Sequence, residues 1–152
     1  MALILGLGSN LGNKVENLKR AETLLRRHFT FVAKSRLYLS PPVDYLDQPD
    51  FVNQAIEFQH TELCPEKIME ILLKTENEMG RQRSIPKGPR IIDLDLLFFG
   101  QETHKSSNVE VPHPRLFERN FVVLPLMELP YYSVLKNVFP FPSFLSTLTT
   151  LN

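Results

Sequence analysis

Apolar residues along the chain change their spacing several times, and each change of spacing predicts a new element. Alternating or continuous apolar runs predict strands, and recurrence every three to four residues predicts helices. Asn13 is suited to cap the first helix, because Glu16 follows it three residues later. The predicted elements are a strand over 2–7, a helix from Asn13 to about His28, a strand within 29–39, a strand over 51–58, a helix from Pro65 to Gly80 and a strand over roughly 90–99.

This order, β-α-β-β-α-β, is that of a ferredoxin-like split βαβ sandwich, an α+β fold with two helices on one face of the sheet. Residues 40–50 and 101–108 are predicted as loops within the domain. C-terminal additions follow: a strand at 109–111, a Pro-His-Pro turn, a short helix near 115–118 and a helix over about 120–128. Residues 130–152 carry many aromatic residues and prolines, and their pattern predicts no element. At 152 residues, 43% of them hydrophobic, the chain is expected to form a single domain over 1–152.

Two carboxylates stand two residues apart in the last predicted strand. Side chains alternate faces in a strand, so Asp93 and Asp95 project the same way and repel each other. A bound Mg²⁺ or Mn²⁺ removes that repulsion, because hard divalent cations prefer oxygen ligands. An edge strand with a hydrated acidic face would show the same alternation.

The residues before these acids favour the metal site. Arg81, Arg83, Lys87 and Arg90 fall within ten residues that contain no acid, although the chain balances 17 basic against 17 acidic residues. Guanidinium groups bind phosphate in a bidentate manner, so the segment predicts a site for a polyphosphate substrate. Phe51 and Asn53 share another strand face, which suits a flat heteroaromatic ligand that needs both stacking and hydrogen bonds.

Other motifs are less specific. The glycines of residues 6–12 do not have the spacing of a dinucleotide-binding loop, and we expect a tight turn that delivers Ser9 and Asn10 to a neighbouring site. His113 stands between two prolines and is compatible with a general acid, a hydrogen-bond donor to phosphate or a surface histidine on a rigid loop. Glu76 and Glu78 are expected on a solvated helix face.

Overall composition points to small-molecule partners. A formal charge of zero and a pI near 6.9 argue against nucleic acids and membrane surfaces as partners. Cys64 is the single cysteine, which excludes an internal disulfide and fits a reducing compartment. The N-terminal residues read as a strand rather than a signal peptide, and no apolar run is long enough to span a membrane. We therefore expect a cytoplasmic monomer.

Taken together, these motifs closely resemble the 6-hydroxymethyl-7,8-dihydropterin pyrophosphokinase family of the folate pathway. The resemblance covers residues 3 to about 128, and its most specific part is Lys-Gly-Pro-Arg-x-x-Asp-Leu-Asp-Leu-Leu at 87–97. The supporting segments are Leu-Gly-Ser-Asn-Leu-Gly at 7–12, Ser-Pro-Pro at 40–42, Asp-Gln-Pro-Asp-Phe-Val-Asn at 47–53, Gly-Arg-Gln-Arg at 80–83 and Val-Pro-His-Pro-Arg-Leu at 111–116.

The resemblance implies transfer of the β,γ-pyrophosphoryl group of ATP to the hydroxymethyl oxygen of the pterin, with release of AMP. It implies two Mg²⁺ ions held by Asp93 and Asp95, and phosphates clamped by Arg81 and Arg90. The pterin ring would lie between Phe51 and Phe121. The other implied substrate-binding residues are Asn10, Ser40, Pro41, Val43 and Asn53, and those on the ATP side are Glu76, Arg83, Arg90, Leu96, His113 and Arg119.

The sequence also departs from the family pattern. Lys87 stands where other members place an aromatic residue, and Asn108 and Glu110 stand where some carry Arg and Thr. Segments 40–50 and 81–89 would be lids that exclude water. The proton acceptor stays open between Asp95 and metal-bound solvent. A catalytically silent binding module and a metal-dependent phosphohydrolase are the alternative functions.

Overall fold

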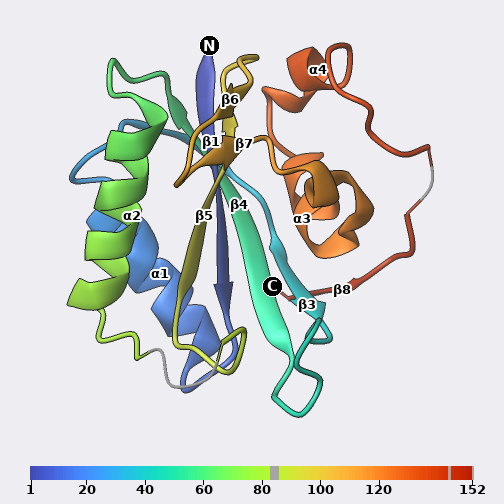
Figure 1. Cartoon of the computed structure of the whole chain (residues 1–152). Helices are drawn as coiled ribbons and strands as arrows, with labels where there is room; N and C mark the ends of the chain where they lie inside the picture. Colours follow the sequence, from blue (N-terminus) through green and yellow to red (C-terminus); the bar gives the residue numbers. More distant parts are fainter. Residues whose placement is uncertain (83–85, 144, 152) are drawn as a thin grey trace.

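The computed structural model describes residues 1–82, 86–143 and 145–151. Within these residues six strands form one antiparallel sheet: β1 (Ala2–Ser9), β2 (Phe31–Lys34), β3 (Leu37–Ser40), β4 (Phe51–Gln59), β5 (Asp93–Phe99) and β8 (Thr149–Leu151). Helices α1 (Lys14–Leu25) and α2 (Pro65–Glu78) pack together on one side of the sheet, as Figure 1 shows. The prediction of two helices on one face of an α+β sheet is confirmed.

The strand order is β5-β1-β4-β3-β8, and β2 also pairs with β4. The sequence predicts one strand within 29–39, whereas the structure divides it into β2 and β3 at Ser35 and Arg36. Pairing continues across this interruption, because the Ser35 N–H donates to the Ala55 carbonyl at 2.9 Å and the Ser35 hydroxyl accepts from the Ala55 N–H at 3.0 Å. Counted as one interrupted strand, β2 and β3 complete the ferredoxin-like arrangement.

The two faces of the sheet bury separate cores. Leu3, Leu5 and Leu7 of β1 point toward α1 and α2, whereas Ala2 and Ile4 point to the other face. On that second face they meet a cluster supplied largely by the C-terminal elements. Those elements are the 3₁₀ helix η1 (Pro114–Glu118) and the helices α3 (Asn120–Leu126) and α4 (Tyr132–Leu135). A small hairpin of β6 (His104–Lys105) and β7 (Glu110–Val111) lies beyond β5.

Several element ends differ from the sequence expectation. The Asn13 cap is confirmed, since its Oδ1 accepts the Glu16 N–H at 3.2 Å, but the helix ends at Leu25 rather than near His28. Helix α2 ends at Glu78, and Gly80 follows with a φ of +84°, a left-handed conformation that glycine adopts without strain. The acidic strand begins at Asp93 rather than at residue 90, so the preceding residues form a loop.

Of the segment for which the sequence predicted no element, the structure describes residues 130–143 and 145–151. It contains α4 and then β8, which adds to the sheet beside β3 near the C-terminus (Figure 1). Phe139 and Phe141 from this segment pack around Phe98 of β5, with ring centroids 5.2 and 6.0 Å from that ring. None of the helices in the described ranges has the length and apolar character needed to cross a membrane.

Candidate active site

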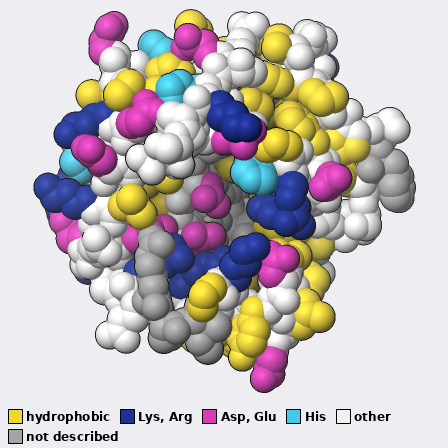
Figure 2. All heavy atoms as spheres, in the orientation of Figure 1, with side chains coloured by type: hydrophobic (Ala, Val, Ile, Leu, Met, Phe, Trp, Pro, Cys, Tyr) yellow, Lys and Arg dark blue, Asp and Glu magenta, His cyan; other side chains and the backbone are white. Residues whose placement is uncertain are grey.

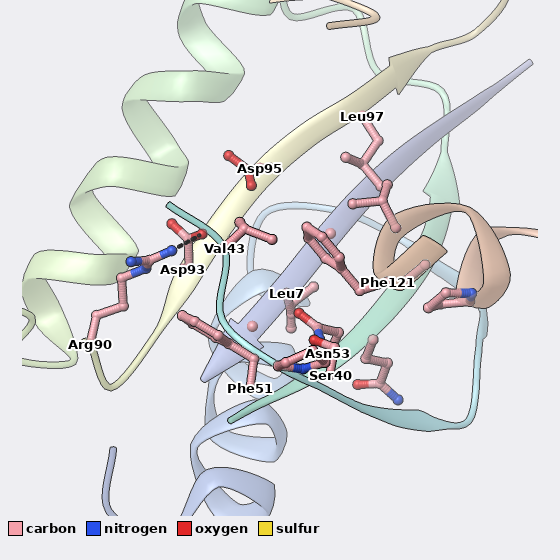
Figure 3. Close-up of a pocket in the computed structure, with 17 residues that line it drawn as sticks. Leu7, Ser40, Val43, Phe51, Asn53, Arg90, Asp93, Asp95, Leu97 and Phe121 are labelled. Atoms are coloured by element: carbon pink, nitrogen blue, oxygen red, sulfur yellow. Dashed lines mark hydrogen bonds and ion pairs between the residues drawn. The ribbon is translucent and has the colours of Figure 1, made fainter. Parts of the chain in front are cut away.

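A pocket opens on the sheet face that α1 and α2 leave uncovered. Strands β1, β4 and β5 form its floor, while the loop after β3 and helix α3 form its walls. Figure 3 shows Phe51 of β4 and Phe121 of α3 directed into it, together with Asn53, Ser40 and Val43. The pocket holds about 580 Å³ of space including its open mouth, which lies within the range of small-molecule sites.

The polar wall of this pocket is held in place by a buried hydrogen bond. The Asn53 amide donates to the Ser40 hydroxyl at 2.6 Å, and both residues are buried. The Asn53 Oδ1 faces Gly8 on the neighbouring strand, where an added Cβ would lie only 3.1 Å away. Gly8 therefore leaves the space that this amide occupies. Its role was not foreseen in the sequence, where the glycine was expected only to shape a turn.

The carboxylates of Asp93 and Asp95 both line this pocket, as strand alternation predicts. Asp93 is bound by two arginines: its Oδ1 accepts from Arg81 Nη1 at 3.0 Å, and its Oδ2 accepts from Arg90 Nη2 at 3.4 Å. The Arg90 guanidinium also stacks over the Phe51 ring, with its central carbon 4.8 Å from the ring centroid. Arg90 thus connects the acidic pair with the aromatic wall (Figure 3).

Asp95 differs from its neighbour, because its carboxylate has no hydrogen bond or ion pair within the part of the chain that the structure describes. It contacts solvent but lies on the floor of a hollow, where the surrounding protein reduces its hydration. The reduced hydration of the carboxyl in this hollow, reinforced by the negative charges of Asp93 and Glu76, raises the pKa of Asp95 to about 7. The site therefore concentrates negative charge that is only partly neutralised.

Glu76 corrects one sequence expectation. It is 2% exposed rather than on a solvated face, whereas Glu78 is indeed exposed. Its Oε2 accepts from the Leu94 backbone N–H at 2.8 Å and from Arg81 Nη1 at 2.7 Å. The sequence did contain a signal for this position, because Glu76 stands four residues after the buried Leu72 and so continues the buried stripe of α2. Glu76 thereby positions Arg81 and the start of β5.

The loops beside the pocket are joined by polar contacts. Asn10 is buried: its amide donates to Gln48 Oε1 at 2.8 Å and to the Pro49 carbonyl at 3.0 Å, and its Oδ1 accepts the Arg90 N–H at 2.9 Å. Gln48 in turn donates to the Lys87 carbonyl at 3.0 Å. The Lys87 ammonium pairs with Asp44 at 3.3 Å. The 40–50 loop therefore contacts the segment around Lys87 directly.

A second hollow lies on the other side of Asp95. It is lined by His113 and Arg119, by Glu110 and Asn108 of the hairpin region, and by the apolar Leu96. His113 Nδ1 accepts the backbone N–H of Arg115 at 3.2 Å, so a neutral His113 ring carries its proton on Nε2. Asp95 and Leu97 line both hollows, and the two sites therefore meet at the acidic strand.

Figure 2 shows this centre from outside: acidic side chains lie within a hollow whose margin carries Lys, Arg and His side chains. The Nε atoms of Arg81, Arg90 and Arg119 are buried and have no hydrogen-bond partner among the described residues. Cationic donors without partners around paired carboxylates fit a phosphate chain bridged to a divalent cation. With two protein carboxylates, the remaining ligands of such a cation would be phosphate oxygens and water. The residues present thus fit Mg²⁺.

The structure brings most of the predicted site residues together. The first hollow contains Ser40, Pro41, Val43, Phe51, Asn53, Arg90, Asp93, Asp95 and Phe121, and the second contains Leu96, His113 and Arg119. Arg81 reaches the site through Asp93 and Glu76, whereas Asn10 and Glu76 line neither hollow. Arg83 lies outside the described residues. The direct ligand contacts implied for these side chains stay predictions.

Comparisons with known proteins give the family. The family model for 7,8-dihydro-6-hydroxymethylpterin-pyrophosphokinase (HPPK) matches residues 4–131. A 2-amino-4-hydroxy-6-hydroxymethyldihydropteridine pyrophosphokinase of Bacillus subtilis is 42% identical over 127 residues, which cover 82% of this chain and 75% of that protein. The Haemophilus influenzae protein of the same name is 39% identical over 137 residues, covering 88% of this chain and 84% of that protein.

Some relatives are larger. This chain matches the mitochondrial folate synthesis bifunctional protein of Arabidopsis thaliana at 41% identity and spans 23% of its length. A crystal structure of Plasmodium falciparum HPPK-DHPS superposes over 84% of this chain and 41% of that one, with a TM-score of 0.65 and 13% identity, which supports the fold alone. The family match, the two bacterial relatives and the fold agree with one another. The chain belongs to the 7,8-dihydro-6-hydroxymethylpterin-pyrophosphokinase family.

Proposed function

We propose that this chain is an ATP- and Mg²⁺-dependent pyrophosphokinase of folate biosynthesis. It transfers the β,γ-pyrophosphoryl group of ATP to the hydroxymethyl oxygen of 6-hydroxymethyl-7,8-dihydropterin and releases AMP. Family membership supports the reaction. One structural observation carries the assignment to this site: an aromatic and amide-lined hollow meets a hollow lined by His113 and Arg119, with Asp95 at their junction. Two adjoining sites with acids between them suit transfer between two bound substrates.

The first hollow is the proposed pterin site. A flat bicyclic ring would stack between Phe51 and Phe121, and the Asn53 amide would read its polar edge. The hydrogen bond from Asn53 to Ser40 fixes that amide before the ligand arrives, so little side-chain freedom is lost on binding. The loop residues Pro41 and Val43 form part of the wall of this site.

The second hollow is the proposed nucleotide site. His113 would donate from Nε2 to a phosphate oxygen, since its Nδ1 already accepts a backbone N–H. Arg119 lines the same hollow, and its guanidinium would donate to a phosphate oxygen there. Glu110 also borders this hollow, and a carboxylate turned inward would repel phosphate. The proposed ATP orientation therefore keeps the phosphates toward Asp95 and the arginines rather than toward the hairpin.

Charge neutralisation is the main task of the residues between the two hollows. Two Mg²⁺ ions held by Asp93 and Asp95 would neutralise the phosphate oxygens and orient the transferring group. Arg81 and Arg90 hold Asp93 in the structure, and both can exchange that carboxylate for a phosphate oxygen as negative charge arrives. The hydroxyl proton would pass to Asp95 or to solvent. The contact between the 40–50 loop and Lys87 would then help to exclude water.

An assay of the purified chain with ATP, Mg²⁺ and 6-hydroxymethyl-7,8-dihydropterin tests this proposal, with AMP and pterin pyrophosphate measured together. We expect equal amounts of both products, and neither product when the pterin is omitted or EDTA is added. Binding of both substrates without AMP release would identify a silent binding module. AMP or phosphate release without the pterin would identify a phosphohydrolase.

The compartment and the oligomeric state stay predictions. We expect a monomer in the cytoplasm. Its expected partners are small molecules, because the sequence has no net charge that would attract nucleic acid. Sedimentation of the purified chain at several concentrations measures the oligomeric state directly. A mass of one chain, 17.6 kDa, at every concentration is the expected result.

A further inference from the structure

The C-terminal segment, residues 145–151, lies against both walls of the proposed pterin site. The family model ends at residue 131, so this segment belongs to the part of the chain beyond the family match. It is nevertheless folded: Leu145 packs on the core beside α3, and Leu151 packs on the core beneath α1 and α2. Such an addition can influence the site only through the contacts that it makes with the walls.

The first contact is with the wall that carries Ser40. Strand β8 pairs with β3 in antiparallel register, with Thr149 opposite Leu39 and Leu151 opposite Leu37. Ser40 is the next residue of β3, and its hydroxyl accepts the hydrogen bond that orients Asn53. Without β8, strand β3 would be the edge of the sheet on this side, and edge strands leave backbone groups unpaired.

The second contact is with the wall that carries Phe121. Asn120, the residue before Phe121 and the first of α3, donates from Nδ2 to the Ser146 carbonyl at 3.1 Å and to the Ser146 hydroxyl at 2.9 Å. A third hollow lies behind the two walls, and its lining includes Ser40, Phe121, Ser146 and Leu148. The same short segment therefore borders this hollow and holds both of its sides.

A separate connection joins β3 to the other end of α3. Glu128, two residues beyond that helix, accepts from the Arg36 backbone N–H at 3.0 Å, from Arg36 Nε at 3.1 Å and from the Tyr38 hydroxyl. This connection lies within the family match. Among the described residues, the hydrogen bonds of Ser146 lie next to Phe121, whereas those of Glu128 lie at the opposite end of α3.

We propose that residues 145–151 act as a strap that fixes the distance between the Ser40 wall and the Phe121 wall, and so position the pterin. The inference rests on the proposed function of the first hollow. Asn120 and Ser146 act as positioning residues for the pterin, since neither lines the first hollow. Loosening the strap lets the stacking ring move relative to the amide, which weakens pterin binding but leaves the nucleotide hollow intact.

Asn120→Asp is the test variant, because it keeps the size of the side chain but removes the NH₂ group that donates to Ser146. We expect the KM for the pterin to rise about fivefold to tenfold, the factor for one well-formed hydrogen bond, while the KM for ATP changes less than about twofold. Thr150→Pro, placed in β8, should shift the pterin KM in the same direction because it disturbs the pairing with β3.

Glu128→Ala is the matched control, since it cuts the tie at the far end of α3. It should lower the melting temperature at least as much as Asn120→Asp without a selective rise in the pterin KM. Equal rises in the pterin KM for Glu128→Ala and Asn120→Asp would refute the proposed role of residues 145–151. An unchanged pterin KM in Asn120→Asp would refute it as well. An inactive wild-type chain would instead refute the proposed function, so the two failures are distinguishable.

Discussion

Removing the Glu76 carboxylate should destabilise the domain more than any exposed acid on the same helix. Glu76→Ala deletes a buried acceptor that serves both the Leu94 N–H and Arg81. Leu94 is 3% exposed, so its N–H would lose its partner in a place that water reaches poorly. A buried donor left unpaired costs about 1–3 kcal/mol.

The lost ion pair adds to this cost. Breaking a buried pair by removing one member costs about 3–5 kcal/mol when the remaining charge has no other partner. Arg81 keeps Asp93 at 3.0 Å, so only part of that penalty applies. We expect a total loss of roughly 3–5 kcal/mol for Glu76→Ala. For a domain of this size that corresponds to a fall in Tm of roughly 6–20 °C.

Two further variants make the test specific. Glu76→Gln keeps an oxygen for the Leu94 N–H but removes the charge, so its loss of stability should be smaller, about 1–2 kcal/mol. Glu78→Ala is the matched control on the same helix, because the Glu78 side chain is 53% exposed and pairs with Arg27 at 3.8 Å. An exposed pair of this kind contributes about 0–1 kcal/mol.

Urea unfolding of the four proteins, followed by circular dichroism, gives the free energies of unfolding. We expect the free energy of unfolding to be highest for wild type and Glu78→Ala, lower for Glu76→Gln and lowest for Glu76→Ala. A Glu76→Ala protein as stable as Glu78→Ala would refute the claim that Glu76 connects α2 to β5. Equal losses for Glu76→Gln and Glu76→Ala would show that the charge matters and the Leu94 hydrogen bond does not.

Three other outcomes are expected. Asp95→Asn should lower kcat roughly a hundredfold or more with a smaller change in ATP affinity, because charge neutralisation matters most in the transition state; a kcat within a factor of three of wild type would contradict this role. Gly8→Ala should raise the pterin KM about tenfold by displacing the Asn53 amide, whose Oδ1 would lie 3.1 Å from the new Cβ. An unchanged pterin KM, measured at saturating ATP, would show that this amide does not bind the pterin. Hydrogen bonds from Ser106 and His104 lower the pKa of Glu66 from 4.5 to about 2, so the stability that they give is present above pH 4.5 and is lost as the pH falls toward 2. The urea midpoint of Glu66→Gln should therefore change less between pH 4.5 and pH 2 than the wild-type midpoint does. Midpoints of the two proteins that fall in parallel with pH would refute this contribution of Glu66.

Several features of the site followed from local sequence alone. The Asn13 cap, the two faces of β4 and the shared face of Asp93 and Asp95 were all predicted. Each depends on the alternation of side chains along a strand or on contacts within a few residues, so neighbouring residues alone determine it. The fold class followed from the order of these elements, since a ferredoxin-like sheet is defined by that order.

Tertiary structure decided the features that depend on which distant residues meet. The buried place of Glu76 requires β5 to lie against α2, and the division between β2 and β3 requires Ser35 to pair with Ala55. The three-residue strand β8 has no periodic signal, and it forms because β3 offers it an edge. Sequence pattern therefore determined the strand faces and the chemical types of the site, whereas packing and strand pairing decided which charges are buried, which hollows adjoin and what holds their walls apart.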